Sequence, residues 1–522
     1  MPRDRELPLS FAQQRLWFLD RLEPESVAYN LPAAIRLTGR LDVDALEQSL
    51  REIIRRHESL RTTFGEVNGQ PLQVISPTQP FSMEVLDLSG LEATEREARA
   101  HALASEEAQR PFNLARGPLL RASLLKLGDD EHIALFTMHH IVSDGWSIGV
   151  LMREVTALYA AFVEGRPSPL PELSIQYADF AAWQREWLQG ETLDEQLAYW
   201  KQQLAGEASM SVLPTDRPRT AKRTYHGSLQ TFRLSQEASE KLKQLSRREG
   251  ATLYMTLLAA LKTLLSRYGT EGAITVGTPI ANRNRKELEN LIGFFVNTLV
   301  LRTDLSGNPT FKQLLGRVRE VTLGAYAHQD VPFEKLVEEL QPQRDLSGSP
   351  FFNVMFAFQN APEAVLHLPN LTLDSFGADT GTAMFDINLL MEETPQGLSG
   401  VITYQTDLFD RSTVERLLGH FVKLLESIAD EPDAKLSELP MLTEAEQRHL
   451  LADLNDTATD YTRNATLHDL IAAQAARRPE AEALIFRDER LTYADLNARS
   501  NQLAHHLRSL GISSDSLVAV LM

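Results

Sequence analysis

The fold is decided by the stretch His139-His140-Ile141-Val142-Ser143-Asp144-Gly145, which lies between two apolar segments. The run before it, 133–138, has apolar side chains at positions that would face both sides of a sheet, which is typical of a buried strand. The run after it, 148–162, carries apolar residues at helical spacing, and Ser147 is a candidate N-cap. The sequence therefore predicts a strand, a short loop and a helix, with both histidines where the core strand ends.

Histidines at such a position are candidates for chemistry. A rigid strand end can present a side chain to a ligand, and neutral imidazole can accept a proton near neutral pH, so a fixed histidine is a candidate general base. Gly145 would either adopt a positive φ or let a substrate approach the backbone closely. The alternative is a pair of buried structural histidines in a tight turn, and the residues alone leave both interpretations open.

Composition excludes several classes of function. A net charge of −19 over 522 residues argues against nucleic acid or an anionic membrane as the main partner. The absence of cysteine excludes thiol nucleophiles, disulfides and thiolate metal sites, and we expect no metal. The first residues are polar and charged, and no uninterrupted apolar run is long enough to cross a bilayer, so we expect a cytoplasmic protein without membrane contact.

The length predicts more than one core. A proline-rich break at 166–171 suits a boundary between two lobes, and the chain turns polar again after about residue 436. We expect a first lobe over 1–172, a second over 173–440, a linker over 441–465 and a partial domain over 466–522. Helices are expected over 41–56 and 252–268, and strands over 119–127, 132–138, 273–279 and 352–358. The first two strands are joined by Gly128-Asp129-Asp130, which suits the turn of a hairpin. The apolar run 292–302 is interrupted by Asn297, which is either hydrogen-bonded within the fold or facing a cavity.

The central stretch resembles the His-His-x-x-x-Asp-Gly signature of the condensation domains of nonribosomal peptide synthetases. Other segments resemble the remaining motifs of that family in the expected order: 10–19, 56–64, 177–183, 292–298, 328–333 and 344–356. In the last of them Gly348 stands where the family often has Arg. The segment 491–496 resembles the first motif of an adenylation domain, whose Gly-rich phosphate loop is not in this sequence.

The resemblance implies an α/β (α+β) fold: two chloramphenicol-acetyltransferase-like lobes in a V-shaped pseudo-dimer, followed by a C-terminal fragment of an adenylation (AMP-binding) domain. It implies that the amine of a carrier-bound aminoacyl group attacks a donor acyl thioester in a tunnel between the lobes and forms an amide. The residues expected to act fall into three sets. Those expected at the reaction are His140, His139, Asp144 and Gly145. Those expected to contact substrate are Trp146, Ser147, Asn297 and Tyr177. Those expected to support the site are Arg61, as the ion-pair partner of Asp144, and Arg15.

The resemblance also implies the partners. The chain itself would bind no cofactor, because donor and acceptor peptidyl carrier protein domains supply the phosphopantetheine arms, and an adenylation domain lies next to it. The first alternative is a chain-initiating domain that N-acylates the first amino acid with a fatty acyl-CoA. A stand-alone acyl-CoA acyltransferase and a non-catalytic docking domain are further alternatives. The adenylation-like segment disfavours the former, and His140 disfavours the latter, which often lacks the second histidine.

Overall fold

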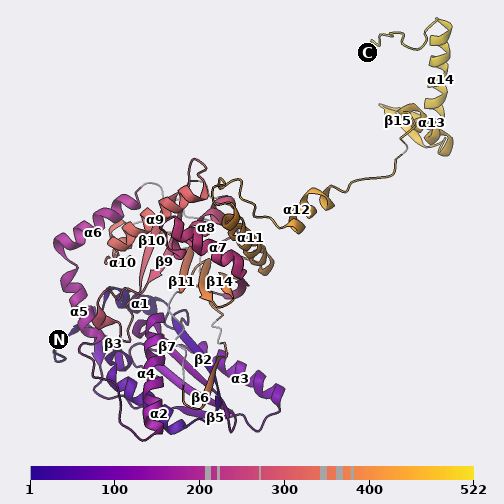
Figure 1. Cartoon of the computed structure of the whole chain (residues 1–522). Coiled ribbons are helices and arrows are strands. Elements are labelled where there is room, and N and C mark those ends of the chain that lie inside the picture. The colour runs from indigo at the N-terminus through magenta and orange to yellow at the C-terminus, as the bar shows by residue number, and fades with distance from the viewer. Residues whose placement is uncertain are drawn as a thin grey trace. The chain divides into compact units, whose positions relative to one another are not determined.

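The computed structural model describes residues 2–205, 213–219, 224–269, 272–340, 350–359, 368–377, 381–461 and 463–521. The chain divides into two compact units, Met1–Thr443 and Glu444–Met522, and Figure 1 shows the elements of each. The first unit contains two lobes, each built on its own sheet. Residues 344–349, including Gly348, and Met522 lie outside the described part of the chain.

The first lobe is built on a five-stranded sheet in the order β12-β2-β7-β6-β5. Its strands are β2 (Asn30–Gly39), β5 (Glu84–Asp87), β6 (Leu120–Gly128), β7 (Glu131–His139) and β12 (Leu371–Ser375). A smaller sheet contains β1 (Leu7–Pro8), β3 (Thr62–Val67) and β4 (Gln70–Ile75). The helices are α1 (Phe11–Leu22), α2 (Val43–Arg56), α3 (Ala93–Ala108), α4 (Gly145–Val163) and α5 (Tyr177–Trp187), with 3-10 turns η1 (Glu58–Arg61) and η2 (His140–Val142).

Strand β7 is buried on both faces, which explains its unbroken apolar run. Phe136 and Met138 pack in the core shared with α2 and α4, whereas Ile133 and Leu135 pack in the core shared with α3. β6 and β7 pair antiparallel, so the predicted hairpin is confirmed. The candidate N-cap was wrong by three residues. Asp144 caps α4, and Ser147 lies in its first turn.

Helix α4 is long and apolar enough to span a membrane by length and composition alone, with 44% of that window buried. The core explains this apolar character, because Val150, Leu151, Val155 and Leu158 pack with α2 and the first sheet. A buried helix of a globular lobe is expected to be apolar on much of its surface. The composition of α4 is therefore accounted for by packing.

The second lobe is built on a six-stranded sheet in the order β10-β9-β11-β13-β14-β8. Its strands are β8 (Gly227–Arg233), β9 (Ala273–Ile280), β10 (Asn297–Asp304), β11 (Val354–Gln359), β13 (Ile387–Thr394) and β14 (Gly397–Gln405). The helices are α6 (Gly190–Gln203), α7 (Gln236–Arg248), α8 (Leu253–Arg267), α9 (Phe311–Ala327), α10 (Phe333–Leu340) and α11 (Arg411–Asp430), with the 3-10 turn η3 (Lys286–Leu288). α7, α8, α9 and α11 contribute to one large core with this sheet.

Three segments depart from the division of the lobes by residue number. α5 follows residue 172 but packs against β1 and η1 of the first lobe. β12 comes from the second half of the chain but pairs antiparallel with β2 in the first sheet. The apolar run that begins at Ile292 does not form one strand, because β10 begins only at Asn297. The residues before it cross to the first lobe and take part in the site described below.

The second unit contains α12 (Glu444–Leu451), η4 (Asp453–Asn455), α13 (Leu467–Arg477), the hairpin of β15 (Glu482–Phe486) and β16 (Glu489–Thr492), and α14 (Tyr493–Ser509). Thr466 and Thr492 each form a capping box at the start of a helix. Several large apolar side chains of this unit are exposed, including Leu467, Leu484, Ile485 and Phe486.

Candidate active site

His139 is a buried, neutral residue. It is the last residue of β7, its side chain is 5% exposed, and its ring lies against the rings of Phe112 and Tyr29. Its Nδ1 accepts a hydrogen bond from the backbone N–H of Ile141 at 3.1 Å. Burial lowers its pKa to about 3, and the neighbouring charges of His140 and Arg121 act in the same direction. His139 is therefore suited to hold the turn and poorly suited to exchange protons.

His140 is only partly buried and has one ring nitrogen available. Its Nδ1 lies 2.8 Å from the carbonyl oxygen of Ser143, and because a carbonyl can only accept, the network assigns the proton to Nδ1. Nε2 then carries a lone pair, and no described residue donates a hydrogen bond to it. Burial lowers the pKa of His140, whereas the negative charge of Asp144 raises it and the positive charge of Arg15 lowers it further. The ring is thus held as a neutral imidazole that can accept a proton at Nε2.

Asp144 is paired with Arg283, and the predicted partner Arg61 is wrong. The Asp144 Oδ1 atom lies 3.1 Å from Nη2 of Arg283 and accepts hydrogen bonds from the N–H and the hydroxyl of Ser147 at 2.8 and 2.7 Å. Arg61 instead donates to the carbonyl of Ser76 at 2.5 Å and lies 3.8 Å from Glu58. Sequence reasoning missed Arg283 because it lies 139 residues from Asp144 and carries no local pattern that marks it as buried.

A segment of the second lobe, residues 288–297, runs against the first lobe, and we call it the strap. Its backbone groups are hydrogen-bonded mainly by side chains. Three side chains accept from N–H groups of the strap: His57 from Ile292, Ser147 from Gly293 and Asp144 from Phe295. Three others donate to its carbonyl groups: Ser59 to Ile292, Tyr177 to Phe294 and Trp146 to Glu289. Arg283 donates to the carbonyls of Leu288 and Leu291.

The strap places an aromatic ring on the imidazole of His140. The ring of Phe294 meets that of His140 edge to face, with centroids 4.7 Å apart. A side chain at Gly293 would prevent this approach, because an ideal Cβ there would lie 2.0 Å from Cδ2 of Tyr177. The strap can therefore pass this closely only with glycine at position 293.

Three of the four residues expected to contact substrate have structural roles here. Tyr177 and Ser147 are buried, and their hydroxyls bind the strap. The question left open at Asn297 is answered by its four hydrogen bonds: Nδ2 donates to the carbonyls of Gln329 and Val331, and Oδ1 accepts from the N–H groups of Thr298 and Phe333. Trp146 differs, because it is 41% exposed while its indole N–H donates to the Glu289 carbonyl.

Gly145 is the first residue of α4 and does not have a positive φ. Of the two explanations for a glycine at this position, the need for a positive φ therefore does not apply. An ideal Cβ at Gly145 would meet no heavy atom within 4 Å. The backbone here borders open space next to the His140 turn. This arrangement fits the expectation that Gly145 leaves room for a substrate.

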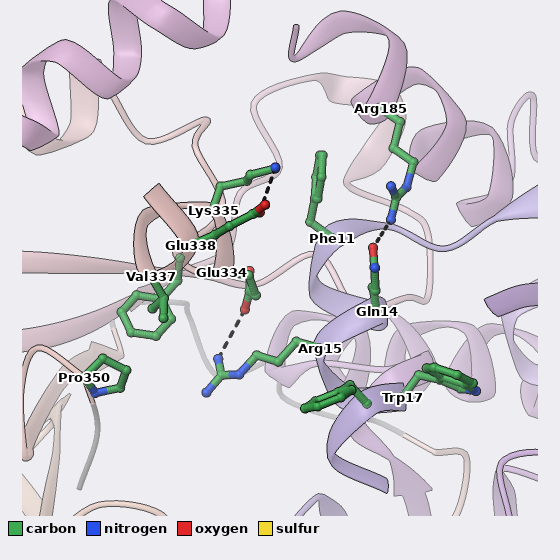
Figure 2. Close-up of a pocket in the computed structure, with 12 residues that line it drawn as sticks. Phe11, Gln14, Arg15, Trp17, Arg185, Glu334, Lys335, Val337, Glu338 and Pro350 are labelled. Atoms are coloured by element: carbon green, nitrogen blue, oxygen red, sulfur yellow. Dashed lines mark hydrogen bonds and ion pairs between the residues drawn. The ribbon is translucent and has the colours of Figure 1, made fainter. Parts of the chain in front are cut away.

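A pocket of about 550 Å³ opens between α1 and α10. Figure 2 shows that Arg15 and Glu334 face one another across it, with 3.2 Å between Nη1 and Oε1. Lys335 pairs with Glu338 at 2.8 Å, and Arg185 donates to Gln14 at 2.5 Å. Arg15, which the sequence predicted as a supporting residue, therefore bridges the two lobes. It also lies near enough to His140 for its charge to lower the pKa of that histidine.

Within the described residues there is no group of three or more His, Asp or Glu side chains arranged to hold a metal ion. The chemistry that the arrangement supports is proton transfer at the Nε2 atom of His140.

Comparison with known proteins identifies the family. A family model for the condensation domain matches residues 3–451, and a model for AMP-binding enzymes matches residues 471–522. One component of the linear gramicidin synthase of Brevibacillus parabrevis is 50% identical over 522 residues, which is 100% of this chain and 7% of the relative. Malpinin synthetase of Mortierella alpina is 45% identical over 518 residues, which is 99% of this chain and 7% of the relative. The chain therefore spans a small part of these relatives.

Solved structures agree with the fold. A complex of the X-domain and OxyB from teicoplanin biosynthesis contains a chain that is 32% identical, with a TM-score of 0.77 over 85% of this chain and 98% of that chain. Holo-AB3403, a four-domain nonribosomal peptide synthetase bound to AMP and glycine, is 25% identical, with a TM-score of 0.83 over 98% of this chain and 39% of that one. The expected fold class is confirmed.

Proposed function

Since this chain belongs to the condensation-domain family of nonribosomal peptide synthetases, we propose that His140 is the residue at which its acyl transfer takes place. Condensation domains of this family are acyltransferases that form amide bonds. The observation that carries the assignment is the tautomer of His140, whose Nδ1–H is bound to Ser143 and whose Nε2 is left to accept a proton. His139, with its Nδ1 bound to Ile141 and its ring between two aromatic rings, has a structural role.

The proposed step is the attack of an acceptor amine on a donor thioester. The amine nitrogen forms a bond to the thioester carbonyl carbon while Nε2 of His140 takes one of its protons. The carbon–sulfur bond then breaks, the electron pair leaves with sulfur, and the proton can pass from His140 to that thiolate. Gly145 and Trp146 begin α4, and their N–H groups have no intrahelical acceptor, whereas the N–H of Ser147 is bound to Asp144; the first two N–H groups would stabilise negative charge on the carbonyl oxygen.

The substrates of this step would be carried by partner proteins. Donor and acceptor peptidyl carrier domains would each present a thioester on a phosphopantetheine arm, and this arm is the partner's group. The pocket between α1 and α10 is a suitable entrance for the acceptor arm, because its wall includes Arg15, whose charge acts on His140. An adenylation domain would lie next to this condensation domain. The reaction would take place in the cytoplasm.

The test is amide formation by the purified chain. An aminoacyl-loaded donor carrier and an aminoacyl-loaded acceptor carrier are mixed with it, and carrier-bound dipeptide is measured by mass spectrometry. Dipeptide formed by the wild type and lost in His140→Ala, with an unchanged far-UV spectrum, supports the proposal. Undiminished product from a folded His140→Ala variant overturns the assignment.

The same assay separates elongation from chain initiation. A fatty acyl-CoA replaces the loaded donor carrier, and N-acylated acceptor is measured. We expect transfer from the carrier-bound aminoacyl donor to be faster, because the relatives are peptide synthases and synthetases that match over nearly the whole chain. A preference for acyl-CoA would instead assign the chain-initiating function.

A further inference from the structure

A buried ionic cluster lies at the end of α2, away from the His140 turn. Arg56 and His57 both bind the carboxylate of Glu154 on α4, through Nη2 to Oε1 at 3.0 Å and Nε2 to Oε2 at 3.0 Å. All three side chains are buried, and Arg56 also donates to the carbonyl of Pro171 at 2.9 Å. The mechanism proposed above uses none of these groups. Burying this much charge costs stability, so a role for the cluster in holding another part of the fold is expected.

The second nitrogen of His57 is bound to the other lobe. The backbone N–H of Ile292, in the strap, donates to Nδ1 of His57 at 3.2 Å. Because an amide N–H can only donate, Nδ1 must be the unprotonated nitrogen, and the proton is on Nε2, where it is donated to Glu154. The carboxylate of Glu154 therefore fixes the one tautomer of His57 that can accept from the strap.

Ile292 is held on both sides by neighbouring residues of the first lobe. His57 accepts from its N–H, and the hydroxyl of Ser59 donates to its carbonyl at 2.7 Å. These bonds fix the peptide groups that flank Ile292, and so they fix its φ and ψ together. Two residues further along the strap, Phe294 places its ring against His140.

We propose that His57 is a positioning residue for the reaction: through Ile292 it sets the strap so that the ring of Phe294 orients the imidazole of His140. This inference rests on the proposed role of His140. It assigns to the Arg56–Glu154–His57 cluster the task of holding the acceptor tautomer of His57. His57 itself touches neither substrate nor His140.

Two variants of His57 separate its two hydrogen bonds. His57→Asn puts a carbonyl oxygen near the position of Nδ1 and can still accept from Ile292, but it loses the contact with Glu154. His57→Gln reaches Glu154 with its amide, but it leaves the N–H of Ile292 without an acceptor. We expect His57→Asn to keep kcat within about threefold of wild type and His57→Gln to lower it at least about tenfold, a factor that corresponds to roughly 1.4 kcal/mol. KM for the loaded carriers should change little in either.

A double-mutant cycle tests whether the effect passes through Phe294. In a Phe294→Ala background, His57→Gln should lower kcat no further, and both single variants should shift the pH of half-maximal kcat by the same amount. Equal kcat in the Asn and Gln variants, or additive losses with Phe294→Ala, would overturn the inference. If His57→Gln does not fold, Ser59→Ala, which releases the other side of Ile292, takes its place with the same expectations.

The outcomes also distinguish this inference from the proposed function. A folded His140→Ala variant that keeps its activity overturns the proposed function and this inference with it. An inactive His140→Ala variant beside indistinguishable Asn and Gln variants of His57 overturns the positioning role alone.

Discussion

The guanidinium of Arg283 lies 3.1 Å from the carboxylate of Asp144, and these side chains are 1% and 2% exposed. The pair joins the loop after β9 in the second lobe to the N-terminus of α4 in the first. Arg283 also binds two strap carbonyls, so the loop that carries His140 and the strap that packs on it have one common anchor. The site is thus assembled from both lobes.

We expect Asp144→Ala and Arg283→Ala each to destabilise the first unit by about 3–5 kcal/mol, because each leaves a buried charge without its partner. The double variant should cost much less than the sum. The measurement is a cycle of urea unfolding curves. Arg61→Ala is the matched control, because Arg61 does not bind Asp144, and its effect should add to that of Asp144→Ala. Additive effects of Asp144 and Arg283 would contradict the coupling.

We expect His140→Ala to lower the rate of amide formation by about 10²–10⁴-fold, the usual contribution of a general base, with little change in melting temperature. His139→Ala should act on stability, at a cost of about 2 kcal/mol or more, because it leaves a cavity beside Phe112 and Tyr29. Melting curves and transfer assays on both variants check this. Equal losses of rate in two well-folded proteins would speak against the division of roles.

Gly145→Ala should fold normally and stay active, because position 145 has no positive φ and a Cβ there meets open space. Gly145→Trp should retain the melting temperature but block transfer to a carrier-bound acceptor, since the indole would occupy the space beside the His140 turn. Side-by-side melts and transfer assays measure both effects. If the activity of each variant merely follows its loss of folding, no substrate passes Gly145.

Arg15→Gln should raise the pKa of His140, because the positive charge of Arg15 lowers it. The basic form of His140 then appears only at higher pH, so the acidic limb of the pH–rate profile should move to higher pH. The profile of kcat between pH 5 and 8 measures this shift. Lys335→Gln, on the same pocket, is the control and should leave the limb in place.

The pKa of His139 predicts a contribution to acid sensitivity. The native residue has a pKa of about 3, whereas an unfolded histidine titrates near 6.5, so between these values the unfolded state binds one more proton. Stability from this residue is therefore full above pH 6.5 and falls by up to about 1.4 kcal/mol per pH unit below it. His139→Asn keeps an acceptor for Ile141 and should lose less stability between pH 6.5 and 4.5. Urea unfolding curves of the wild type and of His139→Asn at several pH values measure this. The same loss of unfolding free energy in both proteins between pH 6.5 and 4.5 would contradict the prediction.

The sequence predicted what depends on neighbours in the chain. The strand before the His140 turn, the hairpin that this strand forms with β6 and the helix after the turn follow from local sequence patterns, and the structure confirms them. It did not predict Arg283, because a buried cation and an exposed one look alike in a basic loop. It also did not show that the strand within the apolar run 292–302 would begin only at Asn297. Apolar composition does not reveal that backbone groups will be bound by side chains 233 residues away.

Asn297 and Tyr177 show a second limit. A polar residue in an apolar run can either bind a ligand or form hydrogen bonds with other groups of the protein. Which of the two it does depends on the groups that surround it. Asn297 is surrounded by backbone groups of residues near α10, and Tyr177 by Ser10 and the strap. These partners are distant in sequence, so the roles became clear only from the structure.

The pairing of β12 with β2 has a practical consequence for exchanging parts between domains of this kind. A first lobe transplanted as a continuous piece ending near residue 172 would lack Leu371–Ser375, and β2 would become the unprotected border of its sheet. Such borders promote association with other chains. A chimera should therefore take residues 368–377 from the same parent as the first lobe, which makes the smallest exchangeable module discontinuous in the gene.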